Sequence, residues 1–370
     1  MDTLSPSAPT SPAPRHSQRP LKVLLVHELF PPDFAGGGEY IVVEIARHLQ
    51  ALGHDVTVLT TGDPSITEHE GMRTKRLPIS RYRLNLAWKA VAAEARDADV
   101  IHGFTYHALY PSHRAARALG KPFVCGILGL FGDVWLEMRG PVIGRMYRAA
   151  EKFLVGLPSD IKLHLSEFSQ EESQRLGVHR PPDRVLEPGI SLGEYYAKSD
   201  KEYVLFTGKL DVRKGIDTVM QVARELPDVP FRVVGWGERF DELAAASPRN
   251  MRVEQRPTDR NNYLSVLAAA RILLFPTKAE TFGLVLPEAM ASGCAIVSTS
   301  PLPFEGVRVR QDDVEGTRRA VRSLWDDPEL CAQCGRQNQI TARRYDWKRH
   351  ADELEQVYRG LLDRRRSAAA

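Results

Sequence analysis

The sequence has few cysteines, no long apolar run and little net charge, and each shortage excludes a class of protein. Four cysteines in 370 residues are too few for a disulfide scaffold, so we expect a reducing, cytoplasmic environment. No run reaches the roughly 18 uninterrupted apolar residues that a membrane-spanning helix needs. The formal charge of +3 is too small to indicate nucleic-acid binding. The rest of the composition, 43% hydrophobic and 26% charged, is that of a globular protein.

Large apolar residues are also scarce in residues 1–20, which are rich in Ser, Pro and Ala. Because this segment lacks the hydrophobic centre of a signal peptide, we expect it to be a disordered tail. Cys331 and Cys334 form a C-x-x-C, but no second Cys pair or His pair stands near them in the sequence. We therefore interpret both as ordinary helix residues, with a redox or metal role as the less favoured alternative.

Apolar runs of strand length alternate with helical patterns along both halves of the chain. In the first half, strands are predicted at 22–27, 55–60, 100–102, 123–127, 162–165 and 184–187, and helices at 39–52, 87–95 and 113–119. In the second half, strands are predicted at 203–207, 231–234, 251–254, 271–276 and 294–298, and helices at 216–226, 263–270, 317–325, 329–343 and 347–362. Such alternation is typical of parallel sheets with helices on both faces, and the length favours two domains. We predict an α/β chain of two domains joined near 188–201, with a cleft between their strand ends.

Two glycine-bearing loops follow predicted strands at the edge where parallel sheets bind ligands. Gly37 and Gly38 belong to a glycine triplet before a helix, where the backbone N–H groups can meet an anion. In the second half, Gly208 is followed by Lys209 and Lys214, which could hold a diphosphate as point charges. A solvated charged turn is the alternative for these cations, and we prefer it for Arg213.

A third loop, Gly235-Trp236-Gly237, ends another predicted strand. Like the other two loops, it lacks the third glycine of the dinucleotide-binding fingerprint, which disfavours an oxidoreductase.

The segment 278–297 (KAETFGLVLPEAMASGCAIV) places one carboxylate in a loop and a second in the helix that follows. Glu280 can accept hydrogen bonds from sugar hydroxyls, and Glu288 can accept from both hydroxyls of a ribose if it faces the cleft. The N–H groups of Phe282, Gly283 and Leu284 begin the helix and can meet phosphate or sugar oxygens. From the residues alone, a solvated loop acid and an ordinary helix acid remain the alternatives.

These segments together resemble the retaining glycosyltransferases of the GT-B fold, glycosyltransferase family 4 in particular. The family pattern E-x-F-G-[LI]-x-x-x-E-A-M-A-x-G corresponds to residues 280–293. The family's donor-phosphate segment corresponds to 208–215, its turn beside the nucleobase to 235–237, and its interdomain turn to 188–190. Tyr345-Asp346-Trp347 resembles the start of the C-terminal helix that returns to the first domain.

The resemblance implies a GT-B fold of two Rossmann-like domains whose parallel sheets face each other across a cleft. The acceptor-binding domain would span 21–190, with the helix 345–363 packed on it, and the nucleotide-sugar domain would span 195–344. The implied reaction is metal-independent, retaining transfer of a sugar from a nucleotide-diphosphate-sugar donor to a hydroxyl of a glycan, glycolipid or small molecule. No protein nucleophile, metal ion or other cofactor would be needed.

The resemblance also implies a role for each matching residue. The catalytic group would be Glu280 with Lys209 and Lys214, which would stabilise negative charge on the leaving diphosphate. Glu288 would bind the ribose. The remaining donor-binding residues would be Gly37, Gly38, Gly208, Gly235, Gly237, Phe282, Gly283 and Leu284.

Two departures from the family pattern leave alternatives open. Lys209 stands where the family usually has Arg, and Leu128 stands where it usually has a histidine near the reacting sugar. His102 or Asp133 could replace that histidine on the acceptor side, although His102 could equally be an interior histidine. The missing histidine supports a non-catalytic nucleotide-sugar-binding protein as an alternative. A nucleotide-sugar epimerase is a further alternative, since that chemistry also uses a two-domain cleft of this kind.

The acceptor is not identified by any motif, but the segment 135–154 mixes Arg139, Arg145, Arg148 and Lys152 with apolar residues. Such a segment could rest on an anionic membrane, which suits a lipid-linked acceptor and peripheral contact with the inner face of a membrane. Two acids, Glu137 and Glu151, dilute its charge, so a solvated helix beside the acceptor is the preferred interpretation.

Overall fold

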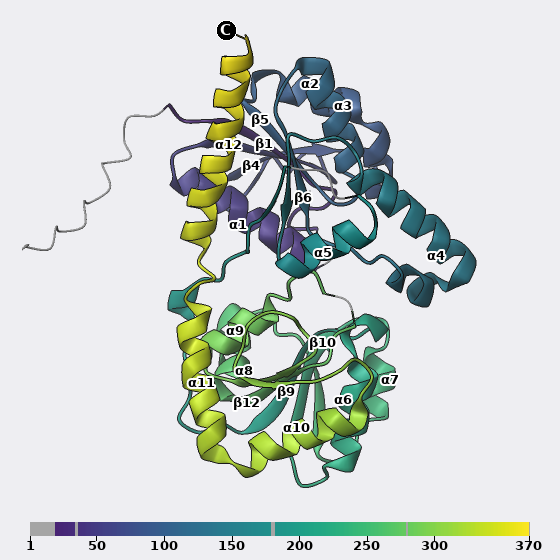
Figure 1. Ribbon diagram of the computed structural model, residues 1–370, viewed down its shortest axis with the longest axis vertical. Helices are drawn as coiled ribbons and strands as arrows, with labels where there is room; N and C mark the ends of the chain where they lie inside the picture. The colour runs from purple at the N-terminus through teal and green to yellow at the C-terminus, as the bar shows by residue number, and fades with distance from the viewer. Residues whose placement is uncertain (1–18, 34–35, 179–181, 279, 370) are drawn as a thin grey trace, which may run out of the picture.

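The computed structural model describes residues 19–369 except 34–35, 179–181 and 279, so most of the tail predicted over 1–20 lies outside the described residues. Two α/β halves lie one above the other in Figure 1, each built around its own parallel sheet. The buried strands read as apolar runs, such as KVLLV and ARILLF, because both faces of a parallel sheet are covered by helices.

The first half contains an eight-stranded sheet of order β3-β4-β2-β1-β5-β6-β7-β8, parallel except for the β3–β4 pair. Its strands are β1 Lys22–Val26, β2 Asp55–Thr61, β3 Glu68–His69, β4 Met72–Leu77, β5 Val100–Phe104, β6 Phe123–Ile127, β7 Ile161–His164 and β8 Asp183–Val185. Its helices are α1 Gly37–Ala51, α2 Trp88–Glu94, α3 Leu109–Leu119, α4 Val134–Val155 and α5 Glu167–Arg175, with 3₁₀ turns η1 Arg81–Leu86 and η2 Ala95–Asp97.

The second half contains a six-stranded parallel sheet of order β11-β10-β9-β12-β13-β14. Its strands are β9 Tyr203–Lys209, β10 Phe231–Trp236, β11 Met251–Gln255, β12 Ala270–Phe275, β13 Ala295–Ser298 and β14 Gly306–Arg308. Its helices are α6 Ile216–Glu225, α7 Phe240–Ala245, α8 Arg260–Ala269, α9 Val285–Ala291, α10 Val314–Asp326 and α11 Pro328–Ala342, with 3₁₀ turns η3 Leu192–Glu194 and η4 Val212–Lys214.

The chain passes between the halves twice, and the two passages touch. Ile190 and Asp346 form a parallel bridge between them. A Cβ atom at Gly189 would lie 2.2 Å from the backbone nitrogen of Trp347, so only glycine allows this close approach. After the second passage, α12 (Trp347–Ala369) packs along α1, and Trp347 and Tyr358 are buried against the first half (Figure 1).

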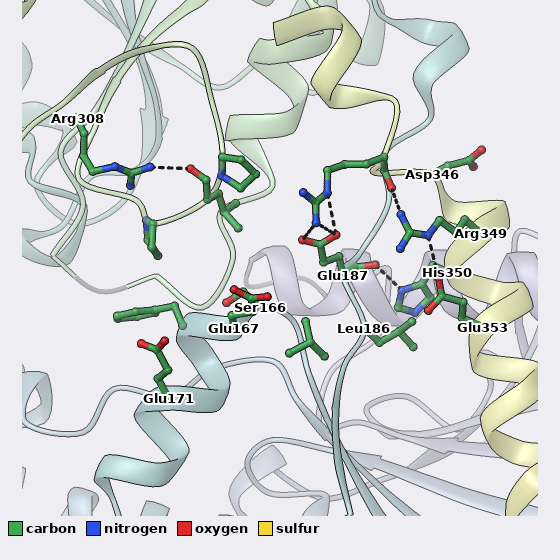
Figure 2. Close-up of a pocket in the computed structure, with 16 residues that line it drawn as sticks. Ser166, Glu167, Glu171, Leu186, Glu187, Arg308, Asp346, Arg349, His350 and Glu353 are labelled. Atoms are coloured by element: carbon green, nitrogen blue, oxygen red, sulfur yellow. Dashed lines mark hydrogen bonds and ion pairs between the residues drawn. The ribbon is translucent and has the colours of Figure 1, made fainter.

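A cavity of 630 Å³ lies beside these passages, between α5, the loop 301–303 and the start of α12 (Figure 2). Arg344 binds the carboxylate of Glu187 through both of its oxygens, at 2.9 and 3.0 Å, and so ties the second passage to the first. Arg349 donates to Glu353 one helical turn further on, at 2.8 Å. Figure 2 shows Glu187, Arg349 and Glu353 on one wall of this cavity, and each of the two carboxylates has an arginine partner.

The elements that the sequence patterns missed have polar residues where an apolar face is expected. Strand β4 alternates in burial, but its inward positions include Thr74 and Arg76. Helix α5 (EFSQEESQR) buries Ser169 and Ser173 instead of large apolar side chains. Apolar periodicity therefore carried no signal for either element.

Candidate active site between the two halves

A cavity of 540 Å³ lies where the strand ends of the two sheets face each other. The first half lines it with the start of α1 and the segments after β1, β5 and β6. The second half lines it with the segments after β9, β10 and β12. The carboxyl ends of parallel strands are where open α/β sheets bind ligands, and here both sheets contribute.

Glu280 and Lys214 form an ion pair on the wall of this cavity that the second half provides. The Lys214 ammonium also lies 5.5 Å from the centre of the Phe275 ring, which fixes its direction. Behind them, Gly283 has φ 84°, and a Cβ atom there would lie 3.0 Å from Cγ of Glu280. The glycine is therefore required both by its backbone conformation and by the packing of Glu280.

The segment between the two acids brings backbone groups to the same wall. Phe282, Gly283 and Leu284 line the cavity, and α9 begins after Leu284 without a side-chain cap. The first backbone bond of this turn is made by the N–H of Leu286, which donates to Gly283. Within the described part of the chain, the N–H groups of 282–284 have no acceptor, so they are available to an oxygen in the cavity.

Glu288 is buried at the cavity wall and is held by three side chains. It accepts hydrogen bonds from Tyr263 Oη at 2.8 Å and Tyr195 Oη at 3.0 Å, and Arg260 Nη1 lies 3.5 Å away. Burial, together with the Glu288 charge, raises the pKa of both tyrosines above the usual range, so both hydroxyls stay protonated donors. A carboxylate has about four acceptor positions, so one or two remain for a ligand.

These three partners of Glu288 were not identified from the sequence. Tyr195 lies in the connection between the halves, and Arg260 and Tyr263 lie on α8. None of them belongs to a motif. Arg260 and Tyr263 meet Glu288 because α8 packs beside α9, and Tyr195 reaches it from the connection between the halves.

Most cationic residues of the cavity wall come from the second half, and the first half adds Arg81 and Arg139. Lys209 lines the cavity and is exposed, and it forms no ion pair with another described residue. The interpretation of Arg213 as a solvated turn residue is wrong, because its side chain is only 17% exposed. Its guanidinium lies 5.0 Å from the centre of the Phe131 ring, across the cavity on the first half. Arg256 is a further cation on this wall, packed over the ring of Trp236 at 5.3 Å.

The glycines singled out from the sequence separate into two groups. Gly37, Gly38 and Gly208 line the cavity. Gly235 and Gly237 do not line it. A Cβ at Gly235 would lie 2.3 Å from the Gly208 carbonyl oxygen, and Gly237 has φ 137°. These two glycines shape the strand end that carries Trp236 into the cavity.

Neither predicted acceptor-side residue lines the cavity. His102 is 1% exposed, and its Nδ1 lies 2.8 Å from the Tyr358 hydroxyl on α12. Burial lowers the pKa of His102 to about 3, so it is a neutral interior residue. Asp133 is 73% exposed on its side chain and pairs with Arg148 at 2.8 Å.

Leu128, at the position where the resemblance implies a histidine, lines the cavity. Its N–H donates to Thr105 Oγ1 at 2.9 Å, and its carbonyl oxygen accepts from Thr281 Oγ1 at 3.0 Å. The second bond joins the two halves. Leu128 therefore provides an apolar surface and a fixed backbone, and supplies no proton donor to the cavity.

Polar groups on the first-half side come instead from Glu28, His27 and His107, which all line the cavity. The Glu28 carboxylate accepts from the backbone N–H groups of Tyr106 and His107, at 3.2 and 3.1 Å. Burial lowers the pKa of His107. These residues follow β1 and β5. Their position at or after the end of a predicted strand was the only signal in the sequence that could have pointed to them.

No cluster of three or more His, Cys, Asp or Glu side chains is arranged to hold a metal ion in the described ranges. Nor does any helix there have the length and apolar character to cross a membrane.

Comparison with known sequences assigns both halves to glycosyltransferases. Residues 35–194 match the model of Glycosyltransferase Family 4, and residues 201–327 match that of Glycosyl transferases group 1. The chain is a glycosyltransferase, with a family 4 domain in its first half and a group 1 domain in its second half.

Curated relatives of this glycosyltransferase align over most of its length. Glycogen synthase of Mycobacterium tuberculosis is 24% identical over 91% of this chain and 94% of its own. Phosphatidyl-myo-inositol mannosyltransferase of Mycolicibacterium smegmatis is 26% identical over 88% and 90%. These relatives act on different acceptors, so the relationship identifies the class of enzyme and leaves the acceptor open.

Solved structures show that the glycosyltransferase has the GT-B fold. Sucrose-phosphate synthase of Thermosynechococcus elongatus superposes with a TM-score of 0.79 at 20% identity, over 93% of this chain and 99% of that one. The Anabaena protein HepE, solved in complex with UDP-glucose, gives a TM-score of 0.75 at 16% identity, over 92% and 100%. The predicted fold of two Rossmann-like domains is thereby confirmed.

Proposed function

We propose that this glycosyltransferase transfers a sugar from a nucleotide-diphosphate-sugar, with retention of anomeric configuration, to a hydroxyl group of a glycan or lipid-linked acceptor. The observation that carries the proposal is that Glu280, Lys214 and Glu288 all lie on one wall of a cavity to which both halves contribute. A donor bound to that wall faces the polar groups of the opposite half, where an acceptor would bind.

The positions of the polar and charged residues on this wall favour one orientation of the bound donor. The ribose hydroxyls would donate to the free acceptor positions of Glu288, and the base would lie toward Trp236 and Arg256. The diphosphate would then lie beside Lys209 and Lys214. Because these two cations and the amides of 282–284 can offset its charge, the proposal includes independence from a metal ion.

The bond changes require a leaving group that also takes a proton. The acceptor oxygen forms a bond to the anomeric carbon while the bond from that carbon to the phosphate oxygen breaks. The electron pair leaves with the diphosphate, whose oxygen takes the proton of the acceptor hydroxyl on the same face. Lys209 and Lys214 stabilise the charge that develops on the diphosphate, and Glu280 holds the sugar through its hydroxyls.

On the acceptor side, we propose that Glu28 and His107 orient the incoming hydroxyl. Glu28 is fixed by two backbone N–H groups, so its direction is set before an acceptor binds. These residues replace His102 and Asp133 in that proposal.

One observation favours a second candidate, a nucleotide-sugar-binding protein without catalysis. Leu128 cannot offer the hydrogen bond that a histidine would make to the donor sugar. An epimerase is less well supported, because Asp133, one of the acids such chemistry would use, lies outside the cavity.

The test is to bind the chain to UDP-, GDP- and ADP-sugars and then measure sugar release and transfer with EDTA present. We expect one nucleotide class to bind, transfer to persist in EDTA, and the product to keep the donor's anomeric configuration by NMR. Lys214→Met should lower kcat by roughly 10²-fold, as loss of a charge-stabilising group does. Binding without turnover would support the second candidate, and an inverted product would refute the retaining assignment.

A further inference from the structure

Helix α4 projects from the first half (Figure 1), and its residues Trp135, Arg139 and Tyr147 line the cavity. It is kinked at Gly140, which has φ 75° and ψ 170°, and Pro141 follows the kink. Beyond the kink, every residue from 141 to 153 is exposed except Gly144 and Glu151. About three turns of helix are thus in contact with the rest of the protein mainly through the side that carries Gly144 and Glu151.

Glu151 forms that attachment. Its buried carboxylate accepts from Tyr106 Oη at 2.6 Å, from Trp135 Nε1 at 3.1 Å, and from the backbone N–H groups of Phe131 and Gly132 at 2.9 and 2.8 Å. The expectation that Glu151 dilutes the surface charge of this segment is therefore wrong. With its charge directed inward, the orientation of the helix is fixed and the opposite face is turned to solvent.

That outer face is apolar. Val142, Met146, Ala149 and Phe153 follow one another at spacings of four, three and four, which places them on one side of a helix. Val142, Met146 and Phe153 are 70%, 68% and 60% exposed. Solitary exposed apolar residues are ordinary in proteins, but a stripe of this length marks an interaction surface.

A row of cations runs along the flank of the stripe: Arg145, Arg148 and Lys152. Arg148 pairs with Asp133, whereas Arg145 and Lys152 make no ion pair with the residues that the structure describes. Exposed apolar residues bordered by cations complement a bilayer surface that contains anionic lipids.

The helix that carries the stripe also contributes to the cavity wall. Arg139 and Tyr147 of α4 line the cavity. Tyr82 of η1 lines it as well and is 59% exposed, and Leu86 of the same turn is 77% exposed. Exposed apolar residues therefore lie on two elements of the first half that contribute to the cavity wall.

We propose that the outer face of α4 docks on an anionic lipid surface and holds the cavity close to that surface, where an acceptor anchored in lipid can reach it. The part about the acceptor rests on the proposed glycosyl transfer. The docking itself depends only on the α4 face.

The test is cosedimentation of the full chain with phosphatidylcholine vesicles that contain or lack phosphatidylglycerol. We expect binding to the anionic vesicles that weakens as salt is added. V142D/M146D should abolish it, whereas I340D, which adds charge at an exposed apolar residue of α11, should bind like the wild type. R145Q/K152Q should weaken binding by about fivefold for each cation removed.

Equal vesicle binding by the wild type and V142D/M146D, or no binding by the wild type, would overturn the proposal. A wild-type dimer in gel filtration that V142D/M146D disrupts, without vesicle binding, would instead assign the face to a second copy of the chain. Glu288→Ala should lose nucleotide binding and keep vesicle binding, and V142D/M146D should show the reverse. Failure of the donor site and failure of the docking surface are thus distinguished.

Discussion

The strongest test of the donor site is the substitution Glu288→Gln, which keeps the volume of the side chain and removes its charge. Tyr195, Tyr263 and Arg260 already occupy two or three of the roughly four acceptor positions of the carboxylate, so a ribose can gain one or two bonds. A hydrogen bond to a charged group contributes about 1.5–3 kcal/mol. Losing one such contribution should raise the Kd of the preferred nucleotide roughly 10- to 100-fold.

The matched control is Lys278→Ala, two residues before Glu280. Lys278 forms an ion pair with Asp312 at 2.9 Å outside the cavity, and surface pairs contribute roughly 0–1 kcal/mol. Its Kd should change less than about twofold. Both constants are to be measured by titration calorimetry, with thermal melts to confirm folding. Equal, small changes in the two variants would refute the ribose role of Glu288.

Three further predictions concern packing and pH. Gly283→Ala should lower activity and cost about 1–2 kcal/mol of stability because φ is 84°, whereas Gly360→Ala, with no atom near its Cβ, should be neutral or slightly stabilising; urea unfolding and activity assays check both. Glu151→Gln should cost at least about 2 kcal/mol in urea, since an amide cannot accept from all four donors, and an unchanged midpoint would contradict the anchoring role. Burial lowers the pKa of His350 to about 4 from an ordinary 6.5, so the unfolded chain binds the proton first and stability should fall as pH decreases from 6.5 toward 4. Around pH 5, His350→Gln should reduce the slope of unfolding free energy by up to about 1.4 kcal/mol per pH unit, and an unchanged slope would contradict this.

The strands of both sheets could be predicted because a strand that is buried on both faces has a continuous apolar run in the sequence. Phe123–Ile127 forms a strand over the whole predicted range, and most of the other predicted strands differ from the structure by one or two residues at an end. Helices with a polar buried face, such as α5, have no apolar pattern from which they could be predicted. The kink in α4 is consistent with its Gly140-Pro141 pair, but the direction of the helix is set by Glu151, which accepts from residues 16 to 45 positions away in the sequence.

The sequence alone determined the order of strands and helices, the glycines that the turns require, and the pair of glutamates. Each of these depends on neighbours within about one turn or one strand, where spacing is enough. Tertiary structure decided which side chains meet. Tyr195 and Tyr263 reach Glu288 from separate segments, and His102 faces α12, which begins some 245 residues later. Only packing can direct one buried residue to the cavity and another to the core, because sequence spacing within a strand does not specify what covers each of its faces.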